Sequence, residues 1–195
     1  SSCAMLKTKF HIILASNSPR RQQLIESMGL DFEIRIKPVD ENFDTSLTPE
    51  EVALYLCSKK ACAFNLEDIG KDNLIIAADT IVCLDNRILS KPKSREHTIE
   101  ILGELSGKTH LVITGVALRT KEKMITFTET TEVVFEKLTL KEIEYYTDRF
   151  KPFDKAGAYG IQEWIGMIGI KSIKGSYFNV MGLPTARLWR ELKSF

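Results

Sequence analysis

The stretch from Leu74 to Pro92 constrains the fold of this chain most strongly. It opens with an apolar run, Leu74 to Ala78, and turns abruptly polar at Asp79 and Thr80. An apolar run of this length indicates a strand that is buried on both faces, as in the centre of an α/β sheet. A carboxylate at the end of such a strand is costly unless it is paired, hydrated or bound to a cation. The stretch therefore predicts a central strand that ends in a charged group.

A hairpin is predicted directly after this strand. A second apolar run, Ile81 to Leu84, is followed by Asp85-Asn86, which suits a two-residue turn. If the strands pair around this turn, residues whose numbers sum to 171 lie opposite each other, so that Thr80 faces Lys91. Asp79 would then lie one place from Lys91. Two interpretations stay open here: a surface salt bridge at the base of a hairpin, or an acid and a base brought together for chemistry.

Charge narrows the range of partners. The 195 residues carry 27 basic and 26 acidic side chains, for a net charge of +1. This balance gives no global reason to expect a nucleic-acid polymer or an anionic membrane surface as partner. No apolar run approaches the roughly 20 residues that a membrane-spanning helix needs. A small anion is still compatible with the composition, because a local cluster of basic residues is enough to bind it.

The length of the chain and the spacing of its cysteines limit the possible domain organisation and cellular compartment. The chain is long enough for one large domain or two closely packed lobes. Ser1 to Ala4 precede Met5 and are interpreted as a vector-derived remnant, which leaves residues 5–195 as a single domain. No signal peptide is recognisable, and the four cysteines show no CxxC spacing. Reduced, buried thiols in a cytoplasmic protein are the interpretation that fits this spacing.

An anion site is predicted where the first strand ends. His11 to Ala15 is typical of a strand, Ser18 of a helix N-cap and Pro19 of a first helical residue. Free amides and the positive end of the helix dipole favour an anion there, and the forked donors of Arg20 and Arg21 suit phosphate. The alternative is a capped helix with a solvated basic turn. Cations at a helix N-terminus oppose its dipole, so the bound anion explains the arginines better.

The remaining segments alternate between helical and extended patterns, as in the α/β class. Helices are expected at about 49–68, 94–105, 139–150 and 184–192, and strands at 32–36, 109–118, 124–135 and 165–173. Asp40-Glu41 are either solvated loop carboxylates or, if the loop lies near the arginines, ligands of a divalent cation. Lys59-Lys60 are best explained by pattern alone as exposed lysines. The chain has no GxxxxGK[ST] motif, so any phosphate is not bound by a P-loop.

Several short blocks, in order along nearly the whole chain, carry a resemblance to a known family. They are Leu14–Arg21 (LASNSPRR), Val39–Glu41, Lys60–Ala61, Ala78–Thr80, Lys91–Pro92, Asp154–Gln162 and Gly175–Pro184. In these blocks the chain resembles the Maf family of nucleoside triphosphate pyrophosphatases. The AYGIQ block looks like the branch that acts on dTTP and UTP. One departure is Glu163-Trp164, where many members have small residues, and it bears on base selection rather than on the reaction.

The resemblance implies a two-lobed Maf/ITPase-like α/β fold around a bent mixed β-sheet, with the active site in a central cleft. It implies hydrolysis of dTTP and UTP to the monophosphate plus pyrophosphate, with Mg²⁺ or Mn²⁺ as the divalent cation. Members of the family are often homodimers. Two alternatives are kept: a nucleotide-binding regulator of cell division with little turnover, or the same reaction on purine or modified nucleotides.

The resemblance also suggests which residues carry the chemistry. Asp79 is expected to act as general base on the attacking water, or to hold the cation that activates it. Glu41 is expected to be the second carboxylate around the metal. Lys60 and Lys91 are expected to neutralise the triphosphate and the departing pyrophosphate.

Substrate binding is expected to involve a second set of residues. Arg20 and Arg21 are expected to add positive charge around the phosphates, and Ser16 to bind phosphate oxygens. Thr80 and Gln162 are expected to recognise the sugar or the base, since a glutamine amide both donates to and accepts from a pyrimidine edge. In the resembled branch the residues that match Arg20, Thr80 and Gln162 are associated with substrate choice.

Overall fold

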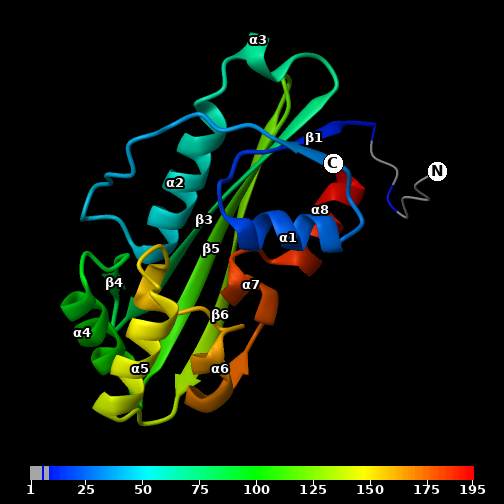
Figure 1. The fold of residues 1–195 in the computed structure, drawn as a ribbon. Helices are drawn as coiled ribbons and strands as arrows, with labels where there is room; N and C mark the ends of the chain where they lie inside the picture. The colour runs from blue at the N-terminus through cyan, green and yellow to red at the C-terminus, as the bar shows by residue number, and fades with distance from the viewer. Residues whose placement is uncertain (1–5, 7–8) are drawn as a thin grey trace. The chain divides into compact units, whose positions relative to one another are not determined.

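The computed structural model describes residue 6 and residues 9–195 (Figure 1). Ser1 to Ala4, interpreted above as a vector-derived remnant, lie outside the described residues. The elements are β1 (His11–Leu14), α1 (Pro19–Ser27), β2 (Phe32–Ile34), α2 (Pro49–Cys62), α3 (Leu66–Ile69), β3 (Asn73–Leu84), β4 (Arg87–Leu89), α4 (Arg95–Leu105), β5 (Thr109–Arg119), β6 (Met124–Phe135), α5 (Leu140–Phe150), a 3₁₀ helix (Ala156–Ala158), α6 (Trp164–Gly169), β7 (Ile170–Lys174), α7 (Tyr177–Met181) and α8 (Thr185–Ser194). Every helix in the described part is too short or too polar to traverse a lipid bilayer.

The strands form a mixed sheet, which confirms the predicted α/β class. The seven strands follow the order β2-β1-β3-β5-β6-β7, with β4 paired to β3 outside this path. β1 runs parallel to both β2 and β3, whereas β4 is antiparallel to β3 and β7 is antiparallel to β6. The apolar run Leu74 to Ala78 is fully buried in β3, as predicted for a strand covered on both faces.

Contacts within the chain divide it into two units. Unit 1 comprises residues 1–79, 114–129 and 182–195, and unit 2 comprises residues 80–113 and 130–181. Each unit has its own apolar core: Phe64 and Ile75 belong to the core of unit 1, and Leu102, Phe135 and Tyr146 to that of unit 2. β3, β5 and β6 contribute residues to both units. The expectation of a single domain over 5–195 stays a prediction.

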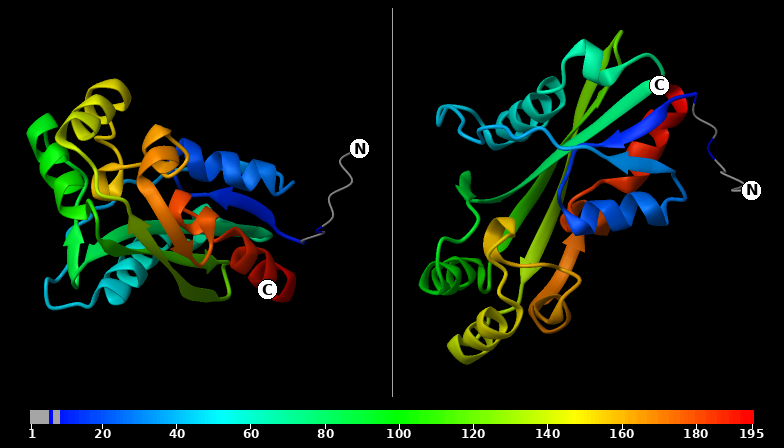
Figure 2. Two further views of the ribbon diagram at one scale, coloured as in Figure 1. Left: turned by 90° about the horizontal axis from the view of Figure 1, so that it is seen from below. Right: turned by 45° about the horizontal axis from the view of Figure 1, so that its top comes forward.

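In unit 1, helices cover both faces of the parallel strands. α1 lies on one side of β1 and α2 on the other (Figure 2). The crossover from β1 to β2 and the one from β2 to β3 run in opposite directions along the strand order β2-β1-β3, and right-handed crossovers of opposite direction place their helices on opposite faces. In unit 2, α4 and α5 pack on each other (Figure 1).

The predicted hairpin is confirmed with its register. Val82 lies opposite Leu89, and the turn residues Asp85 and Asn86 have φ angles of 52° and 61°. Two successive left-handed residues are the conformation that a type I′ turn requires. The ladder ends at Leu89, two residues short of Lys91, so the pairing of Thr80 with Lys91 stays a prediction.

Three local predictions are wrong. The helix expected over 49–68 ends at Cys62, because Asn65 and Asp68 form a capping box that begins a separate helix, α3. Cys62, expected to be buried, is exposed at this helix end. The strand expected over 165–173 begins only at Ile170, after α6. A Cβ on Gly166 would lie 1.8 Å from the carbonyl oxygen of Ile161, so the glycine permits a close helical turn there rather than interrupting a strand.

Candidate active site

Two neighbouring parallel strands position the first candidate residues in unit 1. Leu14 on β1 lies opposite Ile76 on β3, and the Ala15 N–H donates to the Ile76 carbonyl at 2.9 Å. Ser16 therefore follows the carboxyl end of β1, while Asp79 lies three residues beyond Ile76 along β3. The strand order reverses at β1, and open α/β sheets bind ligands beyond the carboxyl ends of strands at such a point.

The start of α1 uses its own side chains to satisfy part of its backbone. Ser18 is the N-cap, and its hydroxyl accepts from the Arg21 N–H at 3.3 Å. The hydroxyl of buried Ser16 accepts from the Ser18 N–H at 3.1 Å. Pro19 has no N–H, so fewer amides at this helix start can bind phosphate than the sequence predicts. The Ser16 hydroxyl keeps its own proton and can still donate it to a phosphate oxygen.

Arg21 is held in place by backbone from a distant part of unit 1. Its Nε donates to the carbonyl of Gly182 at 2.7 Å. Burial lowers the pKa of Arg21 below its ordinary value, and the charge of Arg20 lowers it further, whereas Asp79 and Glu41 raise it. These opposing influences show that Arg20, Asp79 and Glu41 all lie close enough to Arg21 to act on its charge.

Lys60 joins the two candidate carboxylates. Its Nζ lies 2.7 Å from Asp79 Oδ1 and 3.2 Å from Glu41 Oε1. The Lys60 and Asp79 side chains are only 18% and 14% exposed, whereas that of Glu41 is 51% exposed. The interpretation of Lys60 as an exposed lysine, made from pattern alone, is therefore wrong. The structure brings it together with Asp79 and Glu41.

The residues around Lys60 fit a divalent cation that is bound partly by the protein and partly by the phosphates of a substrate. In the described residues no three His, Cys, Asp or Glu side chains cluster so as to hold a metal ion by themselves. Glu41 and Asp79 nevertheless place carboxylate oxygens against one cationic group. Mg²⁺ is commonly bound by one or two carboxylates together with substrate phosphates and water. Two carboxylates are thus a sufficient protein contribution to such a site.

The other three candidates belong to unit 2. Thr80 follows Asp79 directly in β3, and Lys91 is exposed in the segment after β4. Gln162 lies between the 3₁₀ helix and α6, at the end of the Asp154–Gln162 block.

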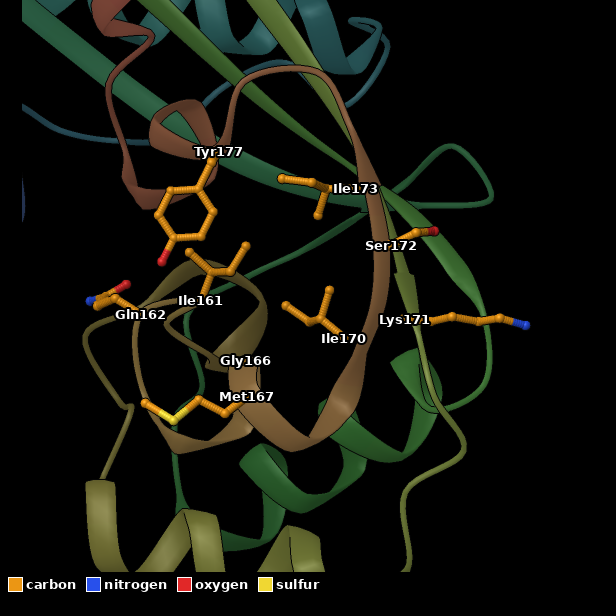
Figure 3. A pocket seen from close by; sticks show the side chains of 9 residues that line it. All are labelled: Ile161, Gln162, Gly166, Met167, Ile170, Lys171, Ser172, Ile173 and Tyr177. Atoms are coloured by element: carbon orange, nitrogen blue, oxygen red, sulfur yellow. The ribbon is translucent and has the colours of Figure 1, made fainter.

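Gln162 lines a mostly apolar pocket in unit 2 (Figure 3). The pocket has a volume of about 340 Å³ and is lined by Ile161, Gln162, Gly166, Met167, Ile170, Lys171, Ser172, Ile173 and Tyr177. Gln162 Oε1 is buried and has no hydrogen-bond partner in the part of the chain that the structure describes. A buried acceptor without a donor is costly, so this oxygen is suited to a ligand that brings an N–H group.

Two features of the site were missed by the sequence analysis. The Gly182 carbonyl that fixes Arg21 carries no side chain that could have marked it. The Tyr146 hydroxyl donates to Glu163 Oε1 at 2.7 Å and accepts from the Gly160 N–H at 3.1 Å. Tyr146 looks like an ordinary core position of an amphipathic helix, and the residues that it contacts are distant in sequence.

Known proteins resemble this chain over nearly all its length. A family described as Maf-like protein matches residues 11–195. A dTTP/UTP pyrophosphatase from Phocaeicola vulgatus is 50% identical over 186 residues, which cover 95% of this chain and 96% of that protein. A dTTP/UTP pyrophosphatase from Bacteroides thetaiotaomicron shows the same identity and coverage.

A solved structure is similar to a smaller extent. The nucleoside-triphosphatase / dITP/XTP pyrophosphatase from Mycobacterium abscessus is 16% identical, with a TM-score of 0.44 over 65% of this chain and 74% of that one. This structural likeness is too weak to assign a family. The family match and the two relatives assign one, because they span the predicted blocks from Ser16 to Gln162. On this evidence of sequence, the chain belongs to the Maf family.

Proposed function

We propose that this chain hydrolyses dTTP and UTP to the nucleoside monophosphate and pyrophosphate. The observation that carries the reaction is the contact of Lys60 with both Asp79 and Glu41, whose charges also act on the partly buried Arg21. The choice of nucleotide is supported by relatives named dTTP/UTP pyrophosphatase that are 50% identical to this chain.

Three free cysteines, Cys57, Cys62 and Cys83, support the reducing cytoplasm as the compartment. A homodimer, implied by the family resemblance, stays a prediction.

Asp79 is the proposed general base. Its carboxylate would take a proton from water as the water oxygen forms a bond to the α-phosphorus. The bond between the α-phosphorus and the oxygen that bridges it to the β-phosphorus breaks, and this oxygen leaves with the electron pair as part of pyrophosphate. Lys60 holds one oxygen of this carboxylate at 2.7 Å, so the base is kept in one orientation.

Positive charge around the phosphates comes from several side chains. Arg21, fixed through Nε by the Gly182 carbonyl, and its neighbour Arg20 would neutralise phosphate oxygens. Ser16 would donate its hydroxyl proton to the same group. Lys91, exposed in unit 2, is kept as a further candidate for neutralising the departing pyrophosphate. Phosphoryl transfer depends mainly on such positioning and charge stabilisation.

Glu41 and Asp79 are the residues proposed to hold Mg²⁺ or Mn²⁺. When bound, the cation would supply charge neutralisation at the triphosphate and lower the pKa of a bound water. The part of Lys60 is to keep both carboxylates at one place, which it does by contacting each of them.

Base recognition is proposed for Gln162 and sugar or base recognition for Thr80. The buried Oε1 of Gln162 would accept the N3–H of uracil or thymine. Cytosine has an acceptor at N3 instead, so it would leave the Gln162 oxygen without a partner. A site that is built around a specific hydrogen bond strongly rejects analogues that cannot form this bond.

The test is pyrophosphate release from dTTP, UTP, CTP, GTP and ATP with Mg²⁺ or Mn²⁺. Release from dTTP and UTP alone is expected, and Asp79→Asn should lower kcat by about 10²–10⁴-fold. Asp85→Asn is the matched control, because it makes the same change in the turn of the same hairpin, where asparagine tolerates the left-handed conformation.

Other outcomes would revise the proposal in different ways. Release mainly from purine triphosphates would retain the chemistry and remove the role given to Gln162. Binding of nucleotides without release would support a nucleotide-binding regulator of cell division. Full activity in excess EDTA would remove the role given to Glu41 and Asp79 as cation ligands.

A further inference from the structure

Glu163 lies at the centre of a small polar network in unit 2. It is the N-cap residue of α6, and its side chain is only 18% exposed. Oε1 accepts from the Tyr146 hydroxyl at 2.7 Å and lies 3.7 Å from Lys155 Nζ. The same tyrosine hydroxyl accepts from the Gly160 N–H at 3.1 Å. The Glu163 carboxylate is therefore tied to the backbone that leads into Gln162.

The space around Gly160 shows which end of the Gln162 amide faces this network. A Cβ on Gly160 would lie 2.6 Å from Glu163 Oε1, 3.1 Å from Lys155 Cε and 3.2 Å from Gln162 Nε2. The amide nitrogen of Gln162 thus lies on the same side of Gly160 as the Glu163 carboxylate. The amide oxygen is the buried atom without a partner in the described chain.

The two ends of a glutamine amide are alike in size but opposite in hydrogen bonding. With its oxygen toward a pyrimidine edge, the amide accepts the N3–H of uracil or thymine. With its nitrogen there, it donates to N3 of cytosine. A glutamine that turns freely would suit either base, so discrimination requires that something else in the protein fix its orientation.

We infer that Glu163 is a positioning residue that fixes this orientation, and so makes the enzyme select uracil and thymine over cytosine. The negative carboxylate attracts the amide NH₂ group toward Gly160 and leaves Oε1 for the ligand. Lys155 carries the opposite charge nearby, but its ammonium also contacts the Asp154 carboxylate at 3.2 Å, so two negative groups face one positive group. The inference rests on the proposed function, because it acts through Gln162 on the nucleotide.

Glu163→Gln tests the inference, since it removes the charge and keeps the shape and an oxygen that can accept from Tyr146. We expect the ratio of kcat/KM for UTP to that for CTP to fall at least about tenfold, through KM, while kcat for UTP changes less than about threefold. Glu163→Asp keeps the charge and should retain a higher ratio than Glu163→Gln. Glu136→Gln, at an exposed glutamate of the same unit, should leave the ratio unchanged.

A double-mutant cycle separates positioning from a general structural effect. Gln162→Ala should lower the UTP/CTP ratio by itself, and adding Glu163→Gln to it should lower the ratio no further. An equal loss of activity on both nucleotides in Glu163→Gln, or an unchanged ratio, would overturn the inference. So would a further fall of the ratio in the double variant. Failure of the proposed function is distinguishable, because the unmodified enzyme would then release no pyrophosphate from UTP.

Discussion

One ammonium group, that of Lys60, decides how the carboxylates of unit 1 are arranged. Asp79 and Glu41 both contact it, at 2.7 and 3.2 Å. Chain position alone does not reveal this, because a lysine near the end of a helix usually extends into water. The family blocks LASNSPRR, VDE and ADT indicated which residues to consider, whereas their mutual contacts required the folded structure.

Lys60→Met should weaken unit 1 and leave two carboxylates near each other without their shared cation. We expect the free energy of unfolding to fall by about 1–3 kcal/mol, because one partner of a partly buried ion pair is removed. Chemical denaturation in EDTA measures this loss. Lys59→Met is the matched control on the preceding residue and should change stability by less than about 0.5 kcal/mol. An equal loss of unfolding free energy in both variants would show that the ion pair of Lys60 with Asp79 does not stabilise unit 1.

At the scale of elements, starts were predictable and some ends were not. α2 and α5 begin within one residue of the starts expected at 49 and 139, because the capping boxes at Thr48 and Thr139 depend on residues within one turn. The hairpin register was predictable for the same reason. The end of α2 and the presence of α6 depend on a second cap at Asn65 and on close backbone packing at Gly166, which the periodic pattern does not show.

Gly115→Ala tests the packing of α2 against β5. A Cβ at this position would lie 2.4 Å from the carbonyl oxygen of Ala53 on α2, so backbone rather than a flexible side chain must move. We expect a loss of about 1–3 kcal/mol in unfolding free energy, together with reduced activity because α2 also carries Lys60. Gly103→Ala is the control: nothing lies within 4 Å of its Cβ, and alanine should stabilise α4 by about 0.5–1 kcal/mol.

For the whole molecule, acid stability should depend on one buried histidine. Burial lowers the pKa of His110 from its ordinary 6.5 to about 4, and its Nε2 lies 2.6 Å from the Tyr159 hydroxyl. The unfolded chain binds a proton at His110 more readily than the folded protein does. The contribution of neutral His110 to the free energy of unfolding is therefore complete above pH 6.5 and is lost as the pH falls toward 4. This loss amounts to about 3 kcal/mol.

Denaturation of the His110→Gln variant between pH 7 and pH 4 measures this contribution. The variant should lose less stability over that range than the unmodified protein, because glutamine does not titrate. Parallel stability curves for the two proteins would show that His110 is not the group responsible. Unfolding must be followed in the absence of nucleotide, since a ligand that binds only the folded state adds its own pH dependence.

The division of the chain into interleaved segments has a consequence for its synthesis on the ribosome. Unit 1 is built from three separate segments, and the last of them begins at Gly182. Arg21 emerges early, yet the carbonyl that fixes its guanidinium belongs to Gly182 and is translated much later. Domains whose residues are contiguous can fold while the rest of the chain is still being made. In the nascent chain Arg21 lacks this partner until Gly182 has been made, so the proposed phosphate-binding end of unit 1 cannot be complete before residues 182–195 join it.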